Sequence, residues 1–443
     1  MRTGPEIAEA APSEARGPVP PTHGPAPAAV ELEELAGQVR RRGQEAGLAA
    51  LGFAPATPME ATRRILEERK AAGLSGGMQF TYRNPARSTD PGRLGKGAAT
   101  LVVGAWPYGP GSGERGGGRR AADLACRVGS RFGDAMPRPT GLVARYARFD
   151  HYADLRNALG RVADVLERAG WWARVVADDN ALVDRAAAHR AGLGWFGKNS
   201  NILLPGRGSW FLLGSVVTDA PLPLDGPTGD GCGSCRRCIG SCPTGALVAP
   251  GVLDARKCLA WLLQAPGVFP FEYRAVLGGR IYGCDDCQEV CPINRVASRT
   301  STAGGQVRAG RPGVTGQAEV DLLELLSAGD EPLLVRYGRW YIPQRDPRYL
   351  RRNALIALGN VADGRLLEVE LALGRYLDGP DELLRAHAVW AALRAGRDDL
   401  VASRPGLAED PSPVVRQELA RRADVPARPG HAQSKPPFPM PRQ

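Results

Sequence analysis

A chain of 443 residues can hold two or three domains and bury a sizeable core. Its 57 Lys and Arg against 47 Asp and Glu give a net charge of +10, which favours a polyanionic partner such as nucleic acid without identifying one. No run of 18 or more apolar residues suggests a membrane span and no signal peptide is recognisable, so we expect a cytoplasmic protein with no membrane partner and no disulfide framework.

The first third of the chain predicts helices and one buried strand. Residues 1–30 are rich in proline and alanine without an apolar period, and we expect a disordered extension there. Apolar residues at helical spacing predict helices over 31–47 and 59–72. The apolar run 99–106 predicts a buried strand, and the glycine-rich residues 109–120 that follow lack a phosphate-binding pattern.

Two neighbouring carboxylates follow a later strand. The run 171–177 predicts a strand that ends at Asp178 and Asp179, and a helix is predicted over 181–191. Helices and strands alternate up to this point and a little beyond, which predicts an α/β or α+β domain over 31–225.

Eight of the nine cysteines form a pattern typical of iron–sulfur proteins. Three cysteines at intervals of three, a fourth four residues later and then a proline is the bacterial ferredoxin spacing, in which the last cysteine of each run ligates the other cluster. The spacing therefore predicts a bis-[4Fe-4S] ferredoxin-like module over 226–298. Its first cluster would be held by Cys232, Cys235, Cys238 and Cys291, and its second by Cys242, Cys258, Cys284 and Cys287.

Structural zinc and disulfides are the alternatives for these cysteines. Zinc sites usually contain two separated Cys-x2-Cys pairs, which does not account for the three-cysteine runs or for Pro243 and Pro292. Disulfides are typical of short secreted chains. Cys126 lies outside both runs, and we expect an ordinary buried thiol there.

The C-terminal part predicts helical repeats. Residues 299–317 are polar and glycine-rich, as in a linker. Apolar helical segments then recur with a period of a little over 30 residues, each near an Asp-Pro or Pro-Asp pair, which predicts stacked helical hairpins of the HEAT type over 318–424. The proline-rich residues 425–443 predict a disordered tail.

Together these stretches resemble the epoxyqueuosine reductases, cobalamin-dependent iron–sulfur enzymes of queuosine biosynthesis in tRNA. The resemblance rests on the cysteine set and on residues 78–80, 191–198, 208–211, 280–287 and 350–353. It implies a cobalamin-binding catalytic domain, a two-cluster module and a helical-repeat segment. It also implies reduction of epoxyqueuosine at the wobble position, with cobalamin reduced through two [4Fe-4S] clusters. The implied partners are the anticodon stem-loop of tRNA and an external low-potential electron donor, and we expect a monomer.

The resemblance also implies an aspartate that donates a proton to the departing oxygen. This role falls on Asp178, seven residues before the helix arginine Arg185. The family usually has Ser or Thr, a small residue and Pro after the acid, whereas this chain has Asp179, Asn180 and Ala181. Asp179 therefore stays open as the acid, and either it or Asn180 could instead cap the helix predicted from Ala181.

Corrin amides need many hydrogen-bond partners and a flat apolar wall. For cobalamin the resemblance implies contacts with Tyr146, Asp178, Lys198, Asn199, Ser200, Asn201, Ser209, Trp210 and Asp285. The tryptophans Trp195 and Trp210 could equally pack in a core, and Asp285 could serve only to turn the cluster loop. His151 stands in an Asp-His-Tyr order where the family has Asp-Tyr-His, and we assign it no role.

Basic residues at the entry of the helical repeat could hold RNA phosphates, or could form a solvated helix face. They are Arg345, Arg348, Arg351 and Arg352. Two alternative functions remain open at this stage. One is a cobalamin and iron–sulfur reductase for a different, non-tRNA epoxide or a halogenated substrate. The other is a non-catalytic electron-transfer module fused to a protein-binding repeat.

Overall fold

The computed structural model describes residues 28–109, 138–300 and 317–426, without the side chains of 298–300. Cys126 and most of the predicted extension, glycine-rich loop, linker and tail fall outside these ranges. Within them, no helix is both long and apolar enough to cross a membrane.

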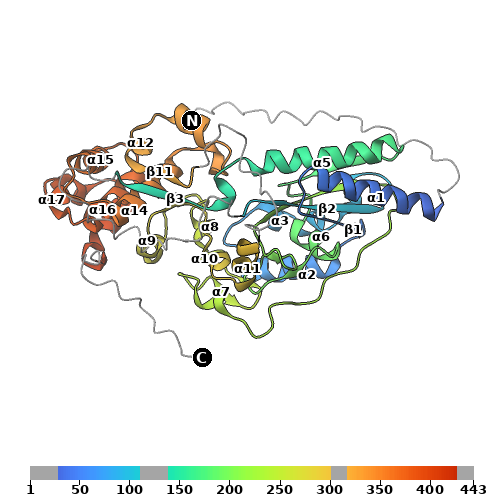
Figure 1. The fold of residues 1–443 in the computed structure, drawn as a ribbon. Helices are drawn as coiled ribbons and strands as arrows, with labels where there is room; N and C mark the ends of the chain where they lie inside the picture. Colours follow the sequence, from blue (N-terminus) through green and yellow to red (C-terminus); the bar gives the residue numbers. More distant parts are fainter. Residues whose placement is uncertain (1–27, 110–137, 301–316, 427–443) are drawn as a thin grey trace, which may run out of the picture.

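A four-stranded antiparallel sheet is the centre of the N-terminal part (Figure 1). Its order is β1 (Ala50–Pro55), β2 (Thr100–Pro107), β7 (Phe211–Thr218) and β4 (Ala173–Val176). Helices α1 (Ala29–Glu45) and α5 (His151–Arg168) cover one face and α6 (Asp184–Arg190) the other. Because both faces are buried, the strands read as continuous apolar runs in the sequence. The antiparallel order makes this domain α+β.

The register of the sheet explains which side chains face which helices. Phe53 lies opposite Val102, and Val102 lies opposite Val216, so these three point to the face packed on α5. Their neighbours Leu101 and Val217 point to the face packed on α6, as expected for a side-chain period of two. The shorter elements of this part are α2 (Glu60–Ala71), α3 (Phe80–Arg83), α4 (Pro85–Ser88), β5 (Trp195–Phe196) and β6 (Ile202–Leu203).

A three-stranded sheet joins the three predicted segments of the chain. β3 (Thr140–Val143) pairs in parallel with β10 (Arg280–Tyr282) and antiparallel with β11 (Glu319–Asp321). Side chains of all three strands belong to the same hydrophobic core as the C-terminal helices. The three segments predicted from the sequence therefore share one hydrophobic core.

The cysteine-bearing part contains mostly very short elements. They are α7 (Arg237–Gly240), β8 (Leu247–Ala249), β9 (Val252–Leu253), α8 (Leu259–Leu262), α9 (Phe271–Leu277), α10 (Asp286–Glu289) and α11 (Pro292–Thr300). Three of these helices have only four residues, which is too short for a helix to be stable by itself. Contacts beyond these helices must therefore hold this part in place.

The C-terminal part is helical, as the repeated segments predict. Its helices are α12 (Leu322–Ser327), α13 (Asp330–Tyr337), α14 (Arg348–Val361), α15 (Leu367–Leu377), α16 (Glu382–Arg394), α17 (Asp398–Ala402) and α18 (Pro413–Ala420). Asp381 caps α16 by accepting a hydrogen bond from the N–H of Leu384, and Ser412 caps α18 in the same way. α16 packs between α14 and α18 and is buried on almost every side.

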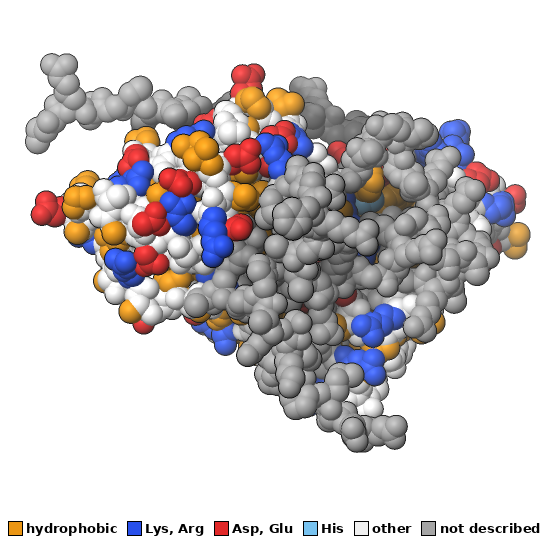
Figure 2. Space-filling model, turned by 60° about the vertical axis from the view of Figure 1, so that its left-hand side comes forward, with side chains coloured by type: hydrophobic (Ala, Val, Ile, Leu, Met, Phe, Trp, Pro, Cys, Tyr) orange, Lys and Arg blue, Asp and Glu red, His pale blue; other side chains and the backbone are white. Residues whose placement is uncertain are grey.

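Acidic and basic side chains alternate on the surface of the described residues (Figure 2). Many of these charges are paired on the C-terminal helices: Arg397 contacts Glu370 and Asp399, and Arg404 contacts Asp378. These ion pairs neutralise part of the positive charge on this surface.

Candidate active site

Asp178 lies on a strained turn directly after β4. Its backbone is in the left-handed region, with φ of 58°, which costs energy for any residue with a Cβ and is tolerated best by Asn and Asp. The carboxyl group is solvent-accessible, yet the surrounding protein removes enough water to raise its pKa. Arg156 opposes this increase in pKa and Asp179 adds to it. A carboxyl group with a raised pKa is suited to donating a proton.

The predicted helix starts three residues later than expected. α6 begins at Asp184, and its N-cap position, Val183, makes no side-chain cap. The prediction that Asp179 or Asn180 caps this helix is therefore wrong. Asp179 Oδ1 instead accepts a hydrogen bond from the N–H of Ala181 at 2.9 Å, which holds the turn that presents Asp178.

Asp184 and Arg185 face the same region from the start of α6. Asp184 Oδ1 is buried with no hydrogen-bond partner among the described residues, and burial, followed by the charge of Asp178, raises its pKa well above the ordinary value. Arg185 donates to the carbonyl of Ser200 at 2.8 Å. Arg185 thereby fixes the 198–201 loop against the helix that follows Asp178.

Four tyrosines, Tyr108, Tyr146, Tyr152 and Tyr282, line the space around Asp178. Burial is the first cause of a raised pKa in all four, followed by charges at the site. The carboxylate of Asp178 raises the pKa of Tyr152 and Tyr282, and the rings of Tyr146 and Tyr282 lie 6.2 Å apart. These contacts define a cluster of aromatic rings with Asp178 at its edge, which we take as the wall of the active-site pocket.

Asp285 lies close enough to Tyr108 and Tyr146 for its charge to raise their pKa. Its Oδ2 accepts a hydrogen bond from the N–H of Arg145 at 2.8 Å, whereas Oδ1 is buried without a partner in the described part of the chain. Burial raises its pKa to about 6. Gly283, two residues before Asp285, lets the backbone pack closely against Tyr146, because a Cβ there would lie 2.8 Å from the ring of Tyr146.

Sequence reasoning named Tyr146 but missed Tyr108, Tyr152, Tyr282 and Asp184. Tyr282 precedes the second cysteine group, and Tyr152 belongs to the reordered Asp-His-Tyr stretch, so a signal was present for both. His151 itself lies 5.9 Å from the ring of Tyr108, and burial lowers its pKa to about 4. His151 is therefore a neutral side chain packed against an aromatic ring, and we assign it no role in the site.

The residues predicted to contact cobalamin divide into two kinds. Several are bonded to the cysteine-bearing part: Lys198 Nζ donates to the carbonyl of Gly233 at 2.5 Å, Asn199 Nδ2 to that of Cys287 at 3.4 Å, and Ser209 Oγ to Gln288 Oε1 at 2.9 Å. The remaining residues of this set lie near the aromatic cluster or have buried polar atoms without a hydrogen-bond partner in the described chain. Ser200 has φ of 66° and a buried hydroxyl without a partner among the described residues.

The tryptophans Trp195 and Trp210 near this loop are buried. Trp210 packs edge-on against Tyr108, with ring centroids 5.9 Å apart. Trp195 packs against Leu203 and Cys291, so the core-packing interpretation holds for it. Asn201 closes the loop through its backbone N–H, which donates to Asn199 Oδ1 at 3.2 Å.

The eight cysteines fall into two sets of four by the charges that act between them, although no three His, Cys, Asp or Glu side chains of the described residues are arranged to hold a single metal ion. Cys232, Cys235 and Cys291 raise the pKa of Cys238, and Cys242, Cys258 and Cys284 raise that of Cys287, in both cases after burial. The groups have the same members as the two sets assigned from the spacing. Arg185 lies close enough to Cys258 to lower its pKa, and Cys287 raises that of Tyr108, so the second group borders the aromatic pocket.

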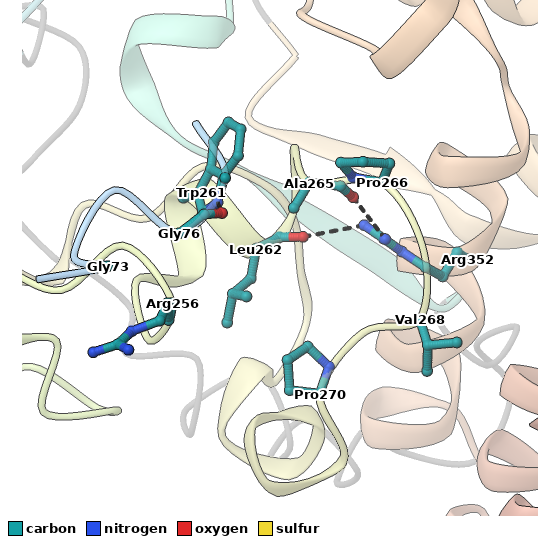
Figure 3. Close-up of a pocket in the computed structure, with 11 residues that line it drawn as sticks. Gly73, Gly76, Arg256, Trp261, Leu262, Ala265, Pro266, Val268, Pro270 and Arg352 are labelled. Carbon is teal, nitrogen blue, oxygen red and sulfur yellow. Dashed lines mark hydrogen bonds between the residues drawn. The ribbon is translucent and has the colours of Figure 1, made fainter. Parts of the chain in front are cut away.

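A cavity of about 430 Å³ lies between the 73–77 loop, the 256–270 segment and α14 (Figure 3). Trp261 Nε1 donates to the carbonyl of Gly76 at 2.8 Å at one end of it. At the other end the guanidinium of Arg352 donates to the carbonyls of Leu262 and Ala265. Its lining is mostly apolar.

Three of the four arginines predicted to hold phosphates are buried or ion-paired, which makes them poor phosphate ligands. Arg352 is 1% exposed and all its bonds go inward, so the prediction is wrong for this residue. Arg351 pairs with Asp330 at 2.5 Å and donates to the carbonyl of Ala328. Arg348 pairs with Asp346 at 2.5 Å, and Arg345 is exposed.

Comparison with known proteins identifies the family. The 4Fe-4S double cluster binding domain family matches residues 231–294, which contain both cysteine groups. Epoxyqueuosine reductases of Bacillus anthracis and Vibrio cholerae are 33% and 32% identical to the chain. The alignments cover 83% and 82% of this chain and 91% and 92% of those proteins. The chain belongs to the epoxyqueuosine reductase family.

Solved epoxyqueuosine reductases share the fold. A selenomethionine-labelled one superposes with a TM-score of 0.75 at 27% identity, covering 88% of this chain and 99% of the other. A second, crystallised with an epoxyqueuosine-modified tRNA-Tyr stem loop, gives 0.74 at 26% identity, covering 88% and 98%. A third, from Bacillus subtilis, has its aspartate-bearing catalytic loop swung out of the active site and gives 0.73 at 26% identity, covering 88% and 99%.

Proposed function

We propose that this protein is an oxidoreductase that reduces the epoxide of epoxyqueuosine in tRNA to the alkene of queuosine. One observation carries the proposal: Asp178, with a raised pKa, edges an aromatic pocket that borders a group of four cysteines. The net reaction takes up two electrons and two protons and releases one water. The pocket combines a proton donor with a neighbouring site for an electron carrier.

The two cysteine groups would each hold one [4Fe-4S] cluster. Cubane clusters carry one electron at a time at low potential, and reducing the epoxide needs two such transfers. The group of Cys242, Cys258, Cys284 and Cys287 borders the pocket, so its cluster would deliver the electrons there. The other group would receive them from an external donor.

The pocket residues fit cobalamin. Asp184 Oδ1, Ser200 Oγ and Asp285 Oδ1 are buried polar atoms without partners in the described chain, and burying such atoms is costly unless something bonds to them. The corrin ring carries amide groups that could satisfy them, while Tyr108 and Trp210 offer an apolar wall. When bound, cobalamin supplies a strongly reducing cobalt centre for the epoxide. We propose that Ser200 and Asp285 hold its amides.

Asp178 is the proposed proton donor. Its raised pKa keeps more of the carboxyl protonated near neutral pH than an ordinary aspartate would be. Asp179 is the weaker alternative, because its Oδ1 is occupied by the N–H of Ala181 in the turn. In this arrangement Asp179 presents Asp178, and Asp178 gives its proton to the departing oxygen.

The test is single-turnover conversion by the anaerobically reconstituted protein. With iron, sulfide, cobalamin, a low-potential reductant and tRNA that carries epoxyqueuosine, mass spectrometry should detect loss of one oxygen from the nucleoside. Asp178→Asn should slow the conversion by about 100-fold or more, since general acid catalysis contributes at least that much, whereas Asp179→Asn should retain most of it. No conversion by fully loaded protein would reject the substrate and favour the non-tRNA epoxide or halogenated alternative.

A further inference from the structure

The segment 338–347 connects α13 to α14 and contacts Tyr282 of the aromatic cluster. The segment is fixed by a buried stack: the ring of Trp340 lies 4.7 Å from that of Tyr337 and 4.5 Å from that of Tyr282. Trp340 Nε1 also donates to the carbonyl of Ala147 at 2.9 Å. The segment is therefore attached to the same residues that form the pocket wall.

Tyr341 is held at this rim by its backbone and exposes its side chain. Its N–H donates to the hydroxyl of Tyr282 at 2.7 Å, and that hydroxyl lies 3.3 Å from its carbonyl. The charge of Asp178 also raises the pKa of Tyr282. The side chain of Tyr341 is 50% exposed, although its neighbours Trp340 and Ile342 are 5% and 6% exposed. A large ring is thus exposed next to the pocket from a backbone that cannot easily move.

The turn that follows Tyr341 has a strained backbone and carries a cation, Arg345. Gln344 and Arg345 both have left-handed backbones, with φ of 53° and 55°, a conformation that is unfavourable for residues with a Cβ. Such strain persists where the surroundings enforce it and is common at functional sites. Arg345 is exposed, and within the described part of the chain its guanidinium makes one long hydrogen bond, of 3.4 Å, to the carbonyl of Gly338.

An exposed aromatic ring and a cation beside a pocket are typical of single-stranded RNA recognition. Unstacked bases lie on aromatic side chains, and nearby cations hold the flanking phosphates. Resting on the proposed function, we propose that Tyr341 is a positioning residue on which a nucleobase next to the modified base of the anticodon loop stacks, with Arg345 at the adjoining phosphate. The modified base can then enter the pocket while its neighbour stays at the rim.

The experiment measures binding and stacking separately. Anticodon stem-loops with epoxyqueuosine are synthesised with 2-aminopurine at either the 5′ or the 3′ neighbour of the modified base. Their affinity and fluorescence are measured with reconstituted wild-type, Tyr341→Ala and Tyr341→Phe proteins. Leu367→Ala removes another exposed apolar side chain, 66% exposed on α15, and is the matched control. Conversion of each stem-loop is followed in parallel by mass spectrometry.

The expected result is a loss of affinity of about tenfold or more for Tyr341→Ala, with Tyr341→Phe and Leu367→Ala within about twofold of wild type. One of the two probes should be quenched by wild type and brighter with Tyr341→Ala. If wild type converts the stem-loop but Tyr341→Ala matches it in affinity and in both probe signals, the inference is wrong and the proposed function stands. An equal loss with Tyr341→Phe would also reject stacking. If wild type neither binds nor converts the stem-loop, the proposed function itself fails.

Discussion

The carboxyl group of Asp178 combines a strained backbone with a raised pKa, and the two have a common consequence for stability. A carboxyl group whose pKa is higher in the folded than in the unfolded state binds protons more tightly when folded. Its contribution to stability is therefore fully present below the unfolded pKa, near 4, and is lost as pH rises through the folded value. At neutral pH the ionised form of Asp178 opposes folding.

Asp178→Asn should consequently stabilise the protein while it inactivates it. Asparagine removes the unfavourable charge and tolerates the left-handed backbone. We expect its melting temperature to exceed that of wild type, by a difference that grows as pH rises from the unfolded pKa, near 4, and levels off above the folded pKa. Scanning calorimetry over this range checks the trend, with Asp179→Asn as the matched control. A difference that does not change with pH would show that the gain does not come from titration of Asp178.

Two arginines near the start of α14, one before the helix and one within it, have opposite roles. The guanidinium of Arg352 bonds to the carbonyls of Ala265 and Gly267 at 2.8 and 2.7 Å and thereby joins the helix to the 262–267 loop. Burial lowers its pKa to about 9, so its charge is maintained by these carbonyls and not by a carboxylate. Arg345, seven residues earlier, bonds to little and faces solvent.

Arg352→Lys should destabilise the protein without changing how it binds RNA. An ammonium group cannot reach all the carbonyls that the guanidinium reaches, and losing hydrogen bonds to a buried charge costs roughly 2–4 kcal/mol. We expect a lower midpoint in thermal denaturation and an unchanged salt dependence of stem-loop binding. The exposed Arg64→Lys serves as the control. Unaltered stability would mean that the carbonyls around Arg352 do not need the guanidinium.

Arg345→Gln should have the reverse effect. It removes an exposed charge without burying anything, so the melting temperature should not change. If Arg345 holds a loop phosphate, stem-loop affinity falls and the slope of log Kd against log salt becomes shallower by about 0.7. Titrations at several salt concentrations measure this slope. The same slope in the variant and wild type would exclude a phosphate contact at Arg345.

These elements also show what a sequence can and cannot predict. Helices such as α1 and α2 and strand β2 follow from apolar spacing, because each pattern is local. The start of α6 was missed because the left-handed turn at Asp178 depends on packing around it. The burial of Arg352 was missed because its partners lie 85 to 90 residues away in the chain.

At the scale of the whole molecule, the same limit applies to the candidate site. Cysteine spacing alone gave the two groups of four, since ferredoxin spacing encodes the arrangement directly. The tyrosine cluster could not be predicted, because Tyr108, Tyr152 and Tyr282 come from three distant segments that meet only when the two sheets form. The sequence therefore predicts the electron carriers better than the pocket that they serve.

The cysteine-bearing part depends on its clusters more than any other part of the molecule does. Its four-residue helices are too short to be stable by themselves. Metal binding to such a segment contributes to the free energy of folding. Anaerobic removal of iron by a chelator should therefore speed hydrogen exchange in β8, α8 and α10. The central strands β2 and β7, buried between two helical layers, should keep their protection.

Single ligand variants separate the two groups. Cys238→Ala and Cys258→Ala should each lose about half of the iron, but only Cys258→Ala should also loosen β10 and the adjoining stack of Tyr282 and Trp340, because the second group borders the pocket. The readouts are iron content and exchange at Tyr341, whose N–H is bonded to Tyr282. Equal exchange at Tyr341 in both variants would mean that the second cluster does not support the pocket wall. Faster exchange in Cys258→Ala alone would mean that the electron carrier and the substrate rim are built as one unit through the three-stranded sheet.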